Sequence, residues 1–320
     1  MTVIAHLTDI HLPPVPVPQL SELSLKRLLG FLNWHRSRKF LHNADVVERI
    51  VRDLKQQNFD HLIVSGDLVN LALEAEFVAG AEWMARLGPA ENISFVPGNH
   101  DYYGSAENFA ARAAHHGTAS VAPLSAYMQS DYHQSDTLQP VREFLSGAGN
   151  GPLQSFLKVV GEVAIIGLNS AIPTPPFKAY DELDAASLAF LEDCLPALKR
   201  AGFYRCVVLH HPPLVGLTPA RRALRNAQEL SAQLVKYGAE LVLYGHNHRQ
   251  QVNRLETSDG FCHVVGTPSA SICKAGPYDR ARYNLFHIER TKDSWKTSMQ
   301  GRGLIEDYGA VNDLGNTLLD

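Results

Sequence analysis

Short apolar runs alternate along the chain with longer segments whose apolar residues recur at helical spacing. Runs of this length that are rich in aliphatic residues and end at polar or glycine-containing loops are typical of buried strands. The clearest of them are 3–7, 62–64, 93–96, 206–209 and 241–244. Because strands alternate with helices, the pattern predicts an α/β fold.

The helix-period segments carry start and stop signals at their ends. They are 43–54, 73–87, 184–195 and 226–237. Asn43 and Asp184 are expected to cap the first and third of these helices, and Asn70 to cap the second rather than to contact substrate. A glycine follows the second and the fourth, and Pro196 is expected to end or kink the third.

Further strand-like runs in the second half of the chain predict a second sheet. They are 163–168, 261–265, 284–288 and 295–299. We therefore expect residues 1–300 to form one domain. Residues 301–320 show no clear period, so we treat them as a C-terminal tail of undefined role.

Composition excludes several classes of protein. The chain has 320 residues, of which 45% are hydrophobic and 19% charged, and this balance is typical of globular proteins. The net charge of −4 disfavours a nucleic-acid-binding surface, since such domains usually carry a basic excess. Four cysteines without a CxxC pair favour reduced, buried thiols. Since we find neither a signal peptide nor an apolar run of roughly 20 residues, we expect a cytoplasmic protein.

Polar residues come directly after the strands named first, where the functional sites of open α/β sheets form. They are Asp9 and His11, Asp67, Asn99 with His100 and Asp101, His210, and His246 with His248. Carboxylate, amide and imidazole ligands without thiolates suit Mn, Fe or Zn. A single aspartate, here Asp67, can bridge two ions, and such a pair can activate a water for an in-line displacement.

These blocks together resemble the signature of the calcineurin-like metallophosphoesterases, over about residues 3–271. The resemblance implies a four-layer α/β/β/α sandwich and two divalent or trivalent metal ions. One ion would be held by Asp9, His11, Asp67 and His248, and the other by Asp67, Asn99, His210 and His246. A metal-bridging hydroxide would be the nucleophile. Asn99 and His100 would bind substrate, and His100 would also protonate the leaving group, with Asp101 orienting it.

Within the family, the GDLVN and GNHD blocks and the segment after DIHL resemble bacterial class III cyclic-nucleotide phosphodiesterases. We therefore expect a phosphodiesterase that acts on a small anionic phosphodiester such as a cyclic nucleotide. The alternatives are a phosphomonoesterase or a pyrophosphohydrolase of a nucleotide-linked lipid precursor. A non-catalytic scaffold is disfavoured because no ligand position is lost, and a nuclease because the chain lacks a basic surface.

The insert 24–42 carries basic residues interleaved with Phe31 and Trp34. The basic residues are Lys26, Arg27, Arg36, Arg38 and Lys39. We favour an amphipathic helix with a solvated basic face. The alternative is a lid that contacts an anionic substrate or a membrane surface.

The remaining histidines are interpreted as structural or solvent-exposed. His211 adjoins a predicted ligand, but neighbours at a strand end point in opposite directions, so we expect it to be structural. His115, His116 and His133 lie in a polar region without ligand spacing, and we expect them to face solvent. A homodimer is possible, since the sequence neither predicts nor excludes one.

Overall fold

The computed structural model describes residues 1–104, 112–114, 121–129, 155–292 and 294–319. The prediction for His115, His116 and His133 stays untested, because these three histidines lie outside the described residues.

The first sheet has its strands in the order β12-β11-β10-β1-β2-β3. In chain order they are β1 (Thr2–Leu7), β2 (His61–Val64), β3 (Ile93–Phe95), β10 (Arg282–Arg290), β11 (Trp295–Leu304) and β12 (Val311–Leu319). β1, β2 and β3 are parallel, whereas β10, β11 and β12 extend the sheet with antiparallel pairing. The carboxyl ends of β1 to β3 therefore share one edge of this sheet.

The second sheet has the order β4-β5-β6-β7-β9-β8. Its strands are β4 (Phe156–Val160), β5 (Val163–Gly167), β6 (Tyr204–Val208), β7 (Leu241–Tyr244), β8 (Gln251–Thr257) and β9 (Gly260–Gly266). β5, β6, β7 and β9 are parallel, and antiparallel strands lie at both edges. The predicted second sheet exists, but two of the runs that suggested it, 284–288 and 295–299, belong to the first sheet.

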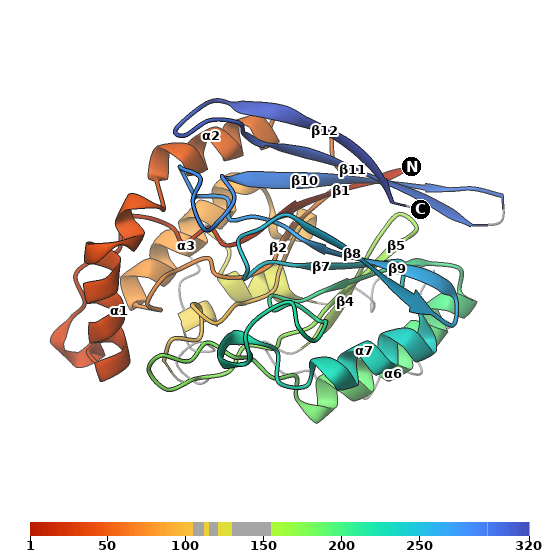
Figure 1. The fold of residues 1–320 in the computed structure, drawn as a ribbon, viewed down its shortest axis with the longest axis horizontal. Coiled ribbons are helices and arrows are strands. Elements are labelled where there is room, and N and C mark those ends of the chain that lie inside the picture. Colours follow the sequence, from red (N-terminus) through yellow and green to blue (C-terminus); the bar gives the residue numbers. More distant parts are fainter. Residues whose placement is uncertain (105–111, 115–120, 130–154, 293, 320) are drawn as a thin grey trace.

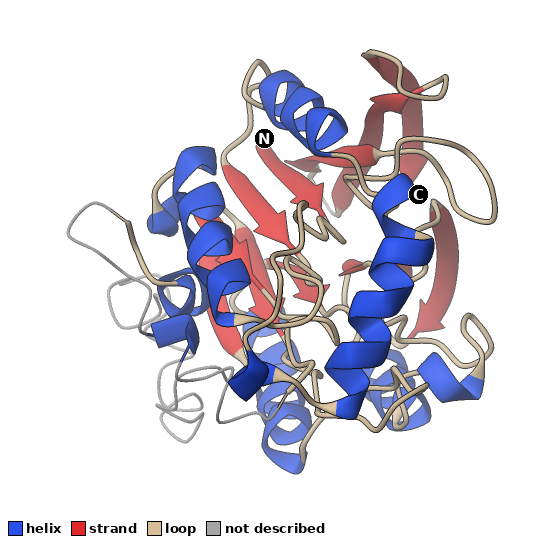
Figure 2. Ribbon diagram, turned by 90° about the vertical axis from the view of Figure 1, so that its left-hand side faces the viewer, coloured by secondary structure: helices blue, strands red, loops and turns tan. Residues whose placement is uncertain are grey.

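Helices cover the outer faces of the two sheets, so the molecule has four layers (Figure 1). The helices are α1 (Leu25–Arg36), α2 (Ala44–Leu54), α3 (Glu74–Leu87), α6 (Ala185–Arg200) and α7 (Ala227–Tyr237). Short 3-10 helices also occur: η1 (Leu20–Glu22), η2 (Arg38–Phe40), η3 (Ala90–Asn92), η4 (Leu124–Met128) and η6 (Ala220–Arg222). The strands lie between blue helical layers in Figure 2. The predicted α/β/β/α sandwich is confirmed.

The alternation of side chains along the second sheet explains the layering. Ile165, Cys206 and Val208 pack in one core with residues of the first sheet. Ile166 and Val207, one position removed, pack in another core with α6 and α7. Because successive side chains on a strand point to opposite faces, strands covered on both faces read as continuous apolar runs.

Two details of the helices differ from the sequence predictions. α6 continues through Pro196 to Arg200, because its buried face continues with Ala197 and Leu198 and packing outweighs the local cost of proline. Asn70 does not cap α3. That position belongs to Leu73, and the Glu76 carboxylate accepts the N–H groups of the residues before the helix.

Residues 301–319 are part of the first sheet rather than a separate tail. They complete β11 and form the edge strand β12. The strand was missed because most of β12 is exposed, so no alternation of apolar and polar residues marks it.

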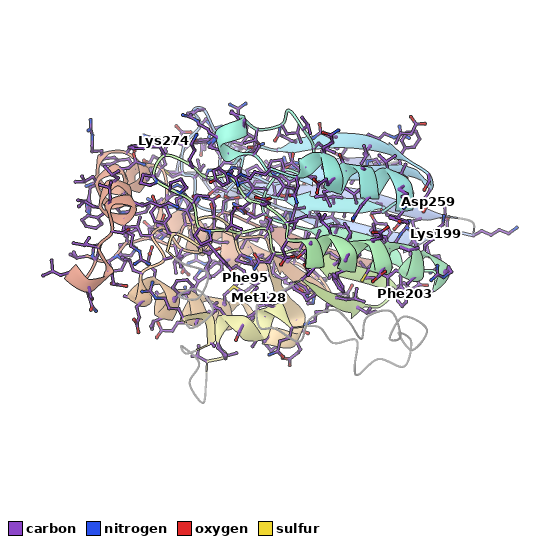
Figure 3. All side chains as sticks on the ribbon, turned by 90° about the horizontal axis from the view of Figure 1, so that it is seen from below. Phe95, Met128, Lys199, Phe203, Asp259 and Lys274 are labelled. Atoms are coloured by element: carbon purple, nitrogen blue, oxygen red, sulfur yellow. The ribbon has the colours of Figure 1, made fainter. Side chains whose placement is uncertain are left out.

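The end of the molecule away from α1 is held by ion pairs. Lys199 and Asp259 lie together there in Figure 3, and Asp259 also pairs with the buried Arg205. Arg205 pairs in addition with Glu240 at 2.7 Å. The four cysteines are buried and form no disulfide, as the sequence predicted. No helix in the described part of the chain is long and apolar enough to cross a membrane.

Candidate metal centre

The predicted ligands lie together at the edge where the parallel strands of both sheets end. Asp9, Asp67 and Asn99 follow β1, β2 and β3, and His210 and His246 follow β6 and β7. Their donor atoms form overlapping groups of three, each within 4.8 Å. Those groups are Asp9, His11 and His248; His11, Asp67 and His100; Asp9, Asp67 and His210; and His210, His211 and His246. Five loops distant in sequence thus supply one cleft.

Asp67 lies between two sets of imidazoles. One oxygen, Oδ2, is 3.6 Å from Nε2 of His11 and 3.4 Å from Nε2 of His210. On one side, Nε2 of His248 is 3.4 Å from Nε2 of His11 and 3.0 Å from Oδ1 of Asp9. Lone-pair donors that converge in this way suit shared cations, and the position of Asp67 suits a bridge between two.

Two of the predicted donor atoms lack a hydrogen-bond partner. Oδ1 of Asn99 and Nε2 of His246 are buried without one, whereas Oδ1 of Asp9 faces Nε2 of His248 and Nε2 of His210 faces Oδ2 of Asp67. A buried polar atom left unpaired costs about 1–3 kcal/mol, so folded proteins rarely keep one. Bound metal ions would satisfy such atoms, and carboxylate, amide and imidazole donors suit Mn, Fe or Zn.

The backbone at these positions is strained. Asp9, His11, Asp67, His246 and His248 all have positive φ, between 43° and 64°. Non-glycine residues adopt this left-handed conformation rarely, and it costs of order 1–3 kcal/mol each. Such strain concentrates at functional sites, where the surrounding fold holds it in place.

Glycines beside the ligands let the backbones approach closely. A Cβ on Gly98 would lie 2.4 Å from Oδ1 of Asp67, and one on Gly245 would lie 2.4 Å from Oδ2 of Asp9. Real Cβ atoms essentially never come this close. The glycines that precede Asn99 and His246 are therefore required by the packing of the cleft.

Neighbouring groups fix the direction of several ligands. Nδ1 of His210 donates to the carbonyl oxygen of Ser65 at 2.8 Å, which leaves Nε2 as the ring nitrogen that faces Asp67 and that a metal can bind. Oδ2 of Asp9 accepts from the Thr8 hydroxyl and from the backbone N–H of His246, each at 2.9 Å, which leaves Oδ1 to face His248. Such outer contacts orient metal ligands.

Charge couples the acidic and basic ligands. Burial by itself lowers the pKa of His210, but the Asp67 carboxylate outweighs it and raises that pKa to about 10. Burial raises the pKa of Asp67, yet His210 and His100 hold it well below its usual range. Nε2 of His210 thus carries a proton directed at Asp67, and a metal ion that binds this nitrogen would displace that proton.

A model of the calcineurin-like phosphoesterases matches residues 2–250. The chain belongs to this family. The matched part contains every predicted ligand, including His248. A search of curated protein sequences finds no match.

Solved structures of two phosphatases resemble the phosphoesterase fold described above. A dimetal phosphatase from Danio rerio has a TM-score of 0.61 at 12% identity, over 98% of this chain and 99% of that one. Purple acid phosphatase from yellow lupin, Lupinus luteus, has a TM-score of 0.50 at 12% identity, over 96% of this chain and 52% of that one. At these identities the likeness shows the fold.

His100 of this phosphoesterase is held differently from the sequence prediction. Its Nδ1 donates to the carbonyl oxygen of Asn70 at 2.6 Å, so Nε2 faces the cleft. Asp101 was expected to orient His100, but its carboxylate accepts the N–H groups of Gly98 and Val69 at 2.8 and 3.1 Å. Burial, followed by repulsion from Asp67, raises the pKa of Asp101 to about 7. Asp101 therefore joins two loops behind the cleft.

His211 lies in the cleft wall rather than pointing away from it. Its ring stacks on His246 at 3.7 Å, and its two nitrogens face Asp181 and the carbonyl oxygen of Ala179 at 2.9 and 2.8 Å. The alternation expected from a strand fails because β6 ends at Val208, so the ring is free to turn inward. His211 supports the imidazole of His246.

Two side chains of the insert also reach the phosphoesterase cleft, and the sequence analysis did not single them out. Arg38 donates to His11 Nδ1 at 2.9 Å and lies 2.8 Å from His100 Nε2. The ring of the buried His42 lies 4.5 Å from that of His11. Their position after the first ligand block was the one signal that pointed to them.

Proposed function

We propose that this phosphoesterase is a dinuclear metal-dependent phosphoric ester hydrolase. One ion is assigned to Asp9, His11, Asp67 and His248, and the other to Asp67, Asn99, His210 and His246. The observation that carries the assignment is the convergence of carboxylate and imidazole donor atoms from distant loops, within 4.8 Å of one another in each group. When bound, two ions would supply an activated water and positive charge for the phosphoryl oxygens.

The residues of the chain itself supply orientation and hydrogen bonds. Nε2 of His100 is directed into the cleft by the bond from Nδ1 to Asn70, so it suits a phosphoryl oxygen or the leaving-group oxygen. The backbone N–H of His100 donates to Oδ1 of Asp67 at 2.7 Å, which joins this residue rigidly to the proposed bridging ligand. Asn99, directly before it, is proposed to contact substrate as well as metal.

For the substrate we propose a small anionic phosphodiester such as a cyclic nucleotide. The resemblance of the GDLVN and GNHD blocks to class III phosphodiesterases supports this choice. The net charge of −4 does not oppose it, because two cations make a cleft locally positive whatever the charge of the whole chain.

Turnover of bis-p-nitrophenyl phosphate with added manganese tests the proposal. We expect metal-dependent hydrolysis by the wild type and a loss of at least about 100-fold in Asp67→Asn, since the bridging carboxylate is removed. Asp193→Asn, an exposed aspartate on α6, is the matched control and should keep full activity. Turnover that needs no metal, or that survives in Asp67→Asn, would contradict the proposal. Relative kcat/KM for p-nitrophenyl phosphate, the diester and a cyclic nucleotide assigns the ester class.

One observation favours a second candidate, a pyrophosphohydrolase of a nucleotide-linked lipid. Leu25, Leu28 and Leu32 form an exposed apolar stripe on α1, with 67%, 43% and 51% of their surfaces accessible. Exposed Arg36 and Lys39 follow the stripe, a combination typical of helices that lie on anionic lipid surfaces. Sedimentation with phosphatidylglycerol vesicles tests this candidate. It fails if the wild type stays in solution or if Leu28→Glu with Leu32→Glu binds equally well.

A further inference from the structure

The structure assigns Arg38 of the insert as the residue that binds the non-bridging oxygens of the substrate's phosphoryl group. This inference rests on the proposed dinuclear site and names a substrate contact that the metal ligands do not provide. It also turns the insert 24–42 from a surface helix into part of the substrate site.

The insert is anchored firmly enough to position Arg38. The guanidinium of Arg27, which is buried, donates to the carbonyl oxygens of Leu71, Ala72 and Glu22 at 3.0, 2.9 and 2.9 Å. Trp34 is also buried and packs in a small apolar cluster with Leu71. α1 is therefore fixed to the loop that leads from β2 into α3, beside the cleft.

The chain just after Arg38 is anchored as well. Nδ1 of His42 lies 2.7 Å from the Ser271 hydroxyl. The carbonyl oxygen of Leu41 accepts the N–H of Cys273 at 2.9 Å, and the N–H of Asn43 donates to Ser271 at 3.0 Å. Arg38 thus sits between two fixed points, and its reach into the cleft is set by the fold.

The guanidinium of Arg38 forms no ion pair within the described residues. Its hydrogen-bond partners in the cleft are His11 and His100. An arginine stays charged at all ordinary pH values, and the carboxylates that attract this one, Asp67 and Asp9, are themselves proposed metal ligands. Metal ions bound to these carboxylates would neutralise them and leave the half-buried guanidinium in need of an anion.

The chemistry of His11 provides an independent reason. Its Nε2 faces Asp9, Asp67 and His248, so this is the nitrogen available to a metal. An imidazole that ligates through Nε2 carries its proton on Nδ1 and cannot accept a hydrogen bond there. In the metal-loaded protein Arg38 therefore loses its acceptor on His11. A phosphoryl group offers several anionic oxygens that match the forked donors of arginine.

Inorganic phosphate, titrated calorimetrically into the manganese-loaded full-length protein, tests the assignment. We expect Arg38→Ala to weaken phosphate binding by about 10-fold to 100-fold, which is typical of a charge-assisted contact. The phosphate affinity of Arg38→Lys should lie between those of the wild type and Arg38→Ala, because lysine keeps the positive charge but lacks the paired N–H donors of the guanidinium. Arg36→Ala, an exposed arginine two residues earlier on α1, is the matched control and should bind like the wild type.

Metal content of the same samples separates the competing explanations. Arg38→Ala with wild-type manganese content and weakened phosphate binding supports the assignment. Equal phosphate affinity in Arg38→Ala and wild type overturns it. So does a loss of manganese from Arg38→Ala, because Arg38 would then act by holding His11. Failure of the proposed hydrolysis itself would appear differently, as metal-loaded wild type that binds phosphate but turns over no ester.

Discussion

At the residue scale, the fold holds several site residues in energetically unfavourable conformations or environments. Asp9, Asp67 and His246 have left-handed backbones, and Nε2 of His246 is also buried without a hydrogen-bond partner. These costs lie in the same cleft, and bound cations would offset them. The ligand positions should therefore respond strongly to small changes in the glycines that surround them.

Gly98→Ala is predicted to impair metal binding without unfolding the protein. The new Cβ would meet both Oδ1 and the backbone nitrogen of Asp67, at 2.4 and 2.7 Å. Since the carboxylate must then move, we expect manganese affinity to fall by about tenfold or more, equivalent to about 1.4 kcal/mol. Equilibrium dialysis measures it. Gly276→Ala, where a Cβ meets nothing within 4 Å, should bind as the wild type does. Unchanged affinity in Gly98→Ala would count against this packing argument.

The strand-end pattern was enough to predict that residues as distant as Asp9 and His248 share a cleft, because parallel strands bring their carboxyl ends to one edge. It could not separate Arg38 from Arg36 in the insert, since that difference depends on how α1 is docked. The family resemblance also implied that Asp101 orients His100, whereas its carboxylate accepts backbone N–H groups. The N–H groups of Gly98 and Val69 reach this carboxylate only when the chain is folded, so the sequence does not reveal these hydrogen bonds.

At the element scale, α1 is docked by the hydrogen bonds of one buried arginine as well as by apolar contact. The helix buries Arg27 and Trp34 but leaves Leu25, Leu28 and Leu32 exposed. The sequence pattern favoured a solvated basic face because charged residues of an amphipathic helix usually face solvent, but Arg27 is buried. Arg27 donates to carbonyl groups of a loop that is distant in sequence. The spacing of apolar residues along the helix cannot predict such a tertiary contact.

Arg27→Met is predicted to lower the free energy of unfolding by about 1–3 kcal/mol, because carbonyl oxygens of buried residues lose a charged donor. Urea denaturation measures this value. Arg36→Met removes an exposed charge from the same helix and should change stability by less than about 0.5 kcal/mol. If both variants unfold alike, α1 is not held as described. Arg27→Met should also weaken phosphate binding, since Arg38 loses its anchor.

Other elements show which features local sequence patterns predict and which they do not. The caps at Asn43 and Asp184 were predicted correctly, since both side chains accept an N–H of the first turn. The prediction that the helix ends or kinks at Pro196 was wrong, because burial of the surrounding helix face outweighs the local cost of proline. The edge strand β12 escaped prediction because exposure on both faces removes the pattern on which strand prediction depends.

At the scale of the whole molecule, polar contacts join the outer helices to the sheets. Asp53 of α2 accepts two bonds from Arg302 of β11, each 2.7 Å, and one from the Tyr283 hydroxyl of β10. Burial by itself raises the pKa of Asp53, but the bonds from Arg302 and Tyr283 outweigh it and hold that pKa below its usual value. This contact ties the C-terminal strands to a helix near the N-terminus.

The stability contributed by Asp53 is predicted to depend on pH. A carboxyl with a lowered folded pKa stabilises the fold above its unfolded pKa of about 3.9 and loses this effect as pH falls through the folded value. Asp53→Asn should thus cost about 2 kcal/mol at pH 7 and progressively less below about pH 4. Urea denaturation across pH measures it. Glu48→Gln, in an exposed pair on the same helix, should have little effect at any pH. A constant cost for Asp53→Asn would contradict the prediction.

The central claim is that this fold gathers its strand-end ligands around two metal ions. The most direct measurement is the manganese bound per chain, by mass spectrometry of the metal after reconstitution and gel filtration of the full-length protein. The account predicts about two ions in the wild type and a clear loss in Asp67→Asn, since that carboxylate faces both ligand sets. A wild-type protein that holds no more than about one ion, or an Asp67→Asn variant that holds as many as the wild type, would contradict it.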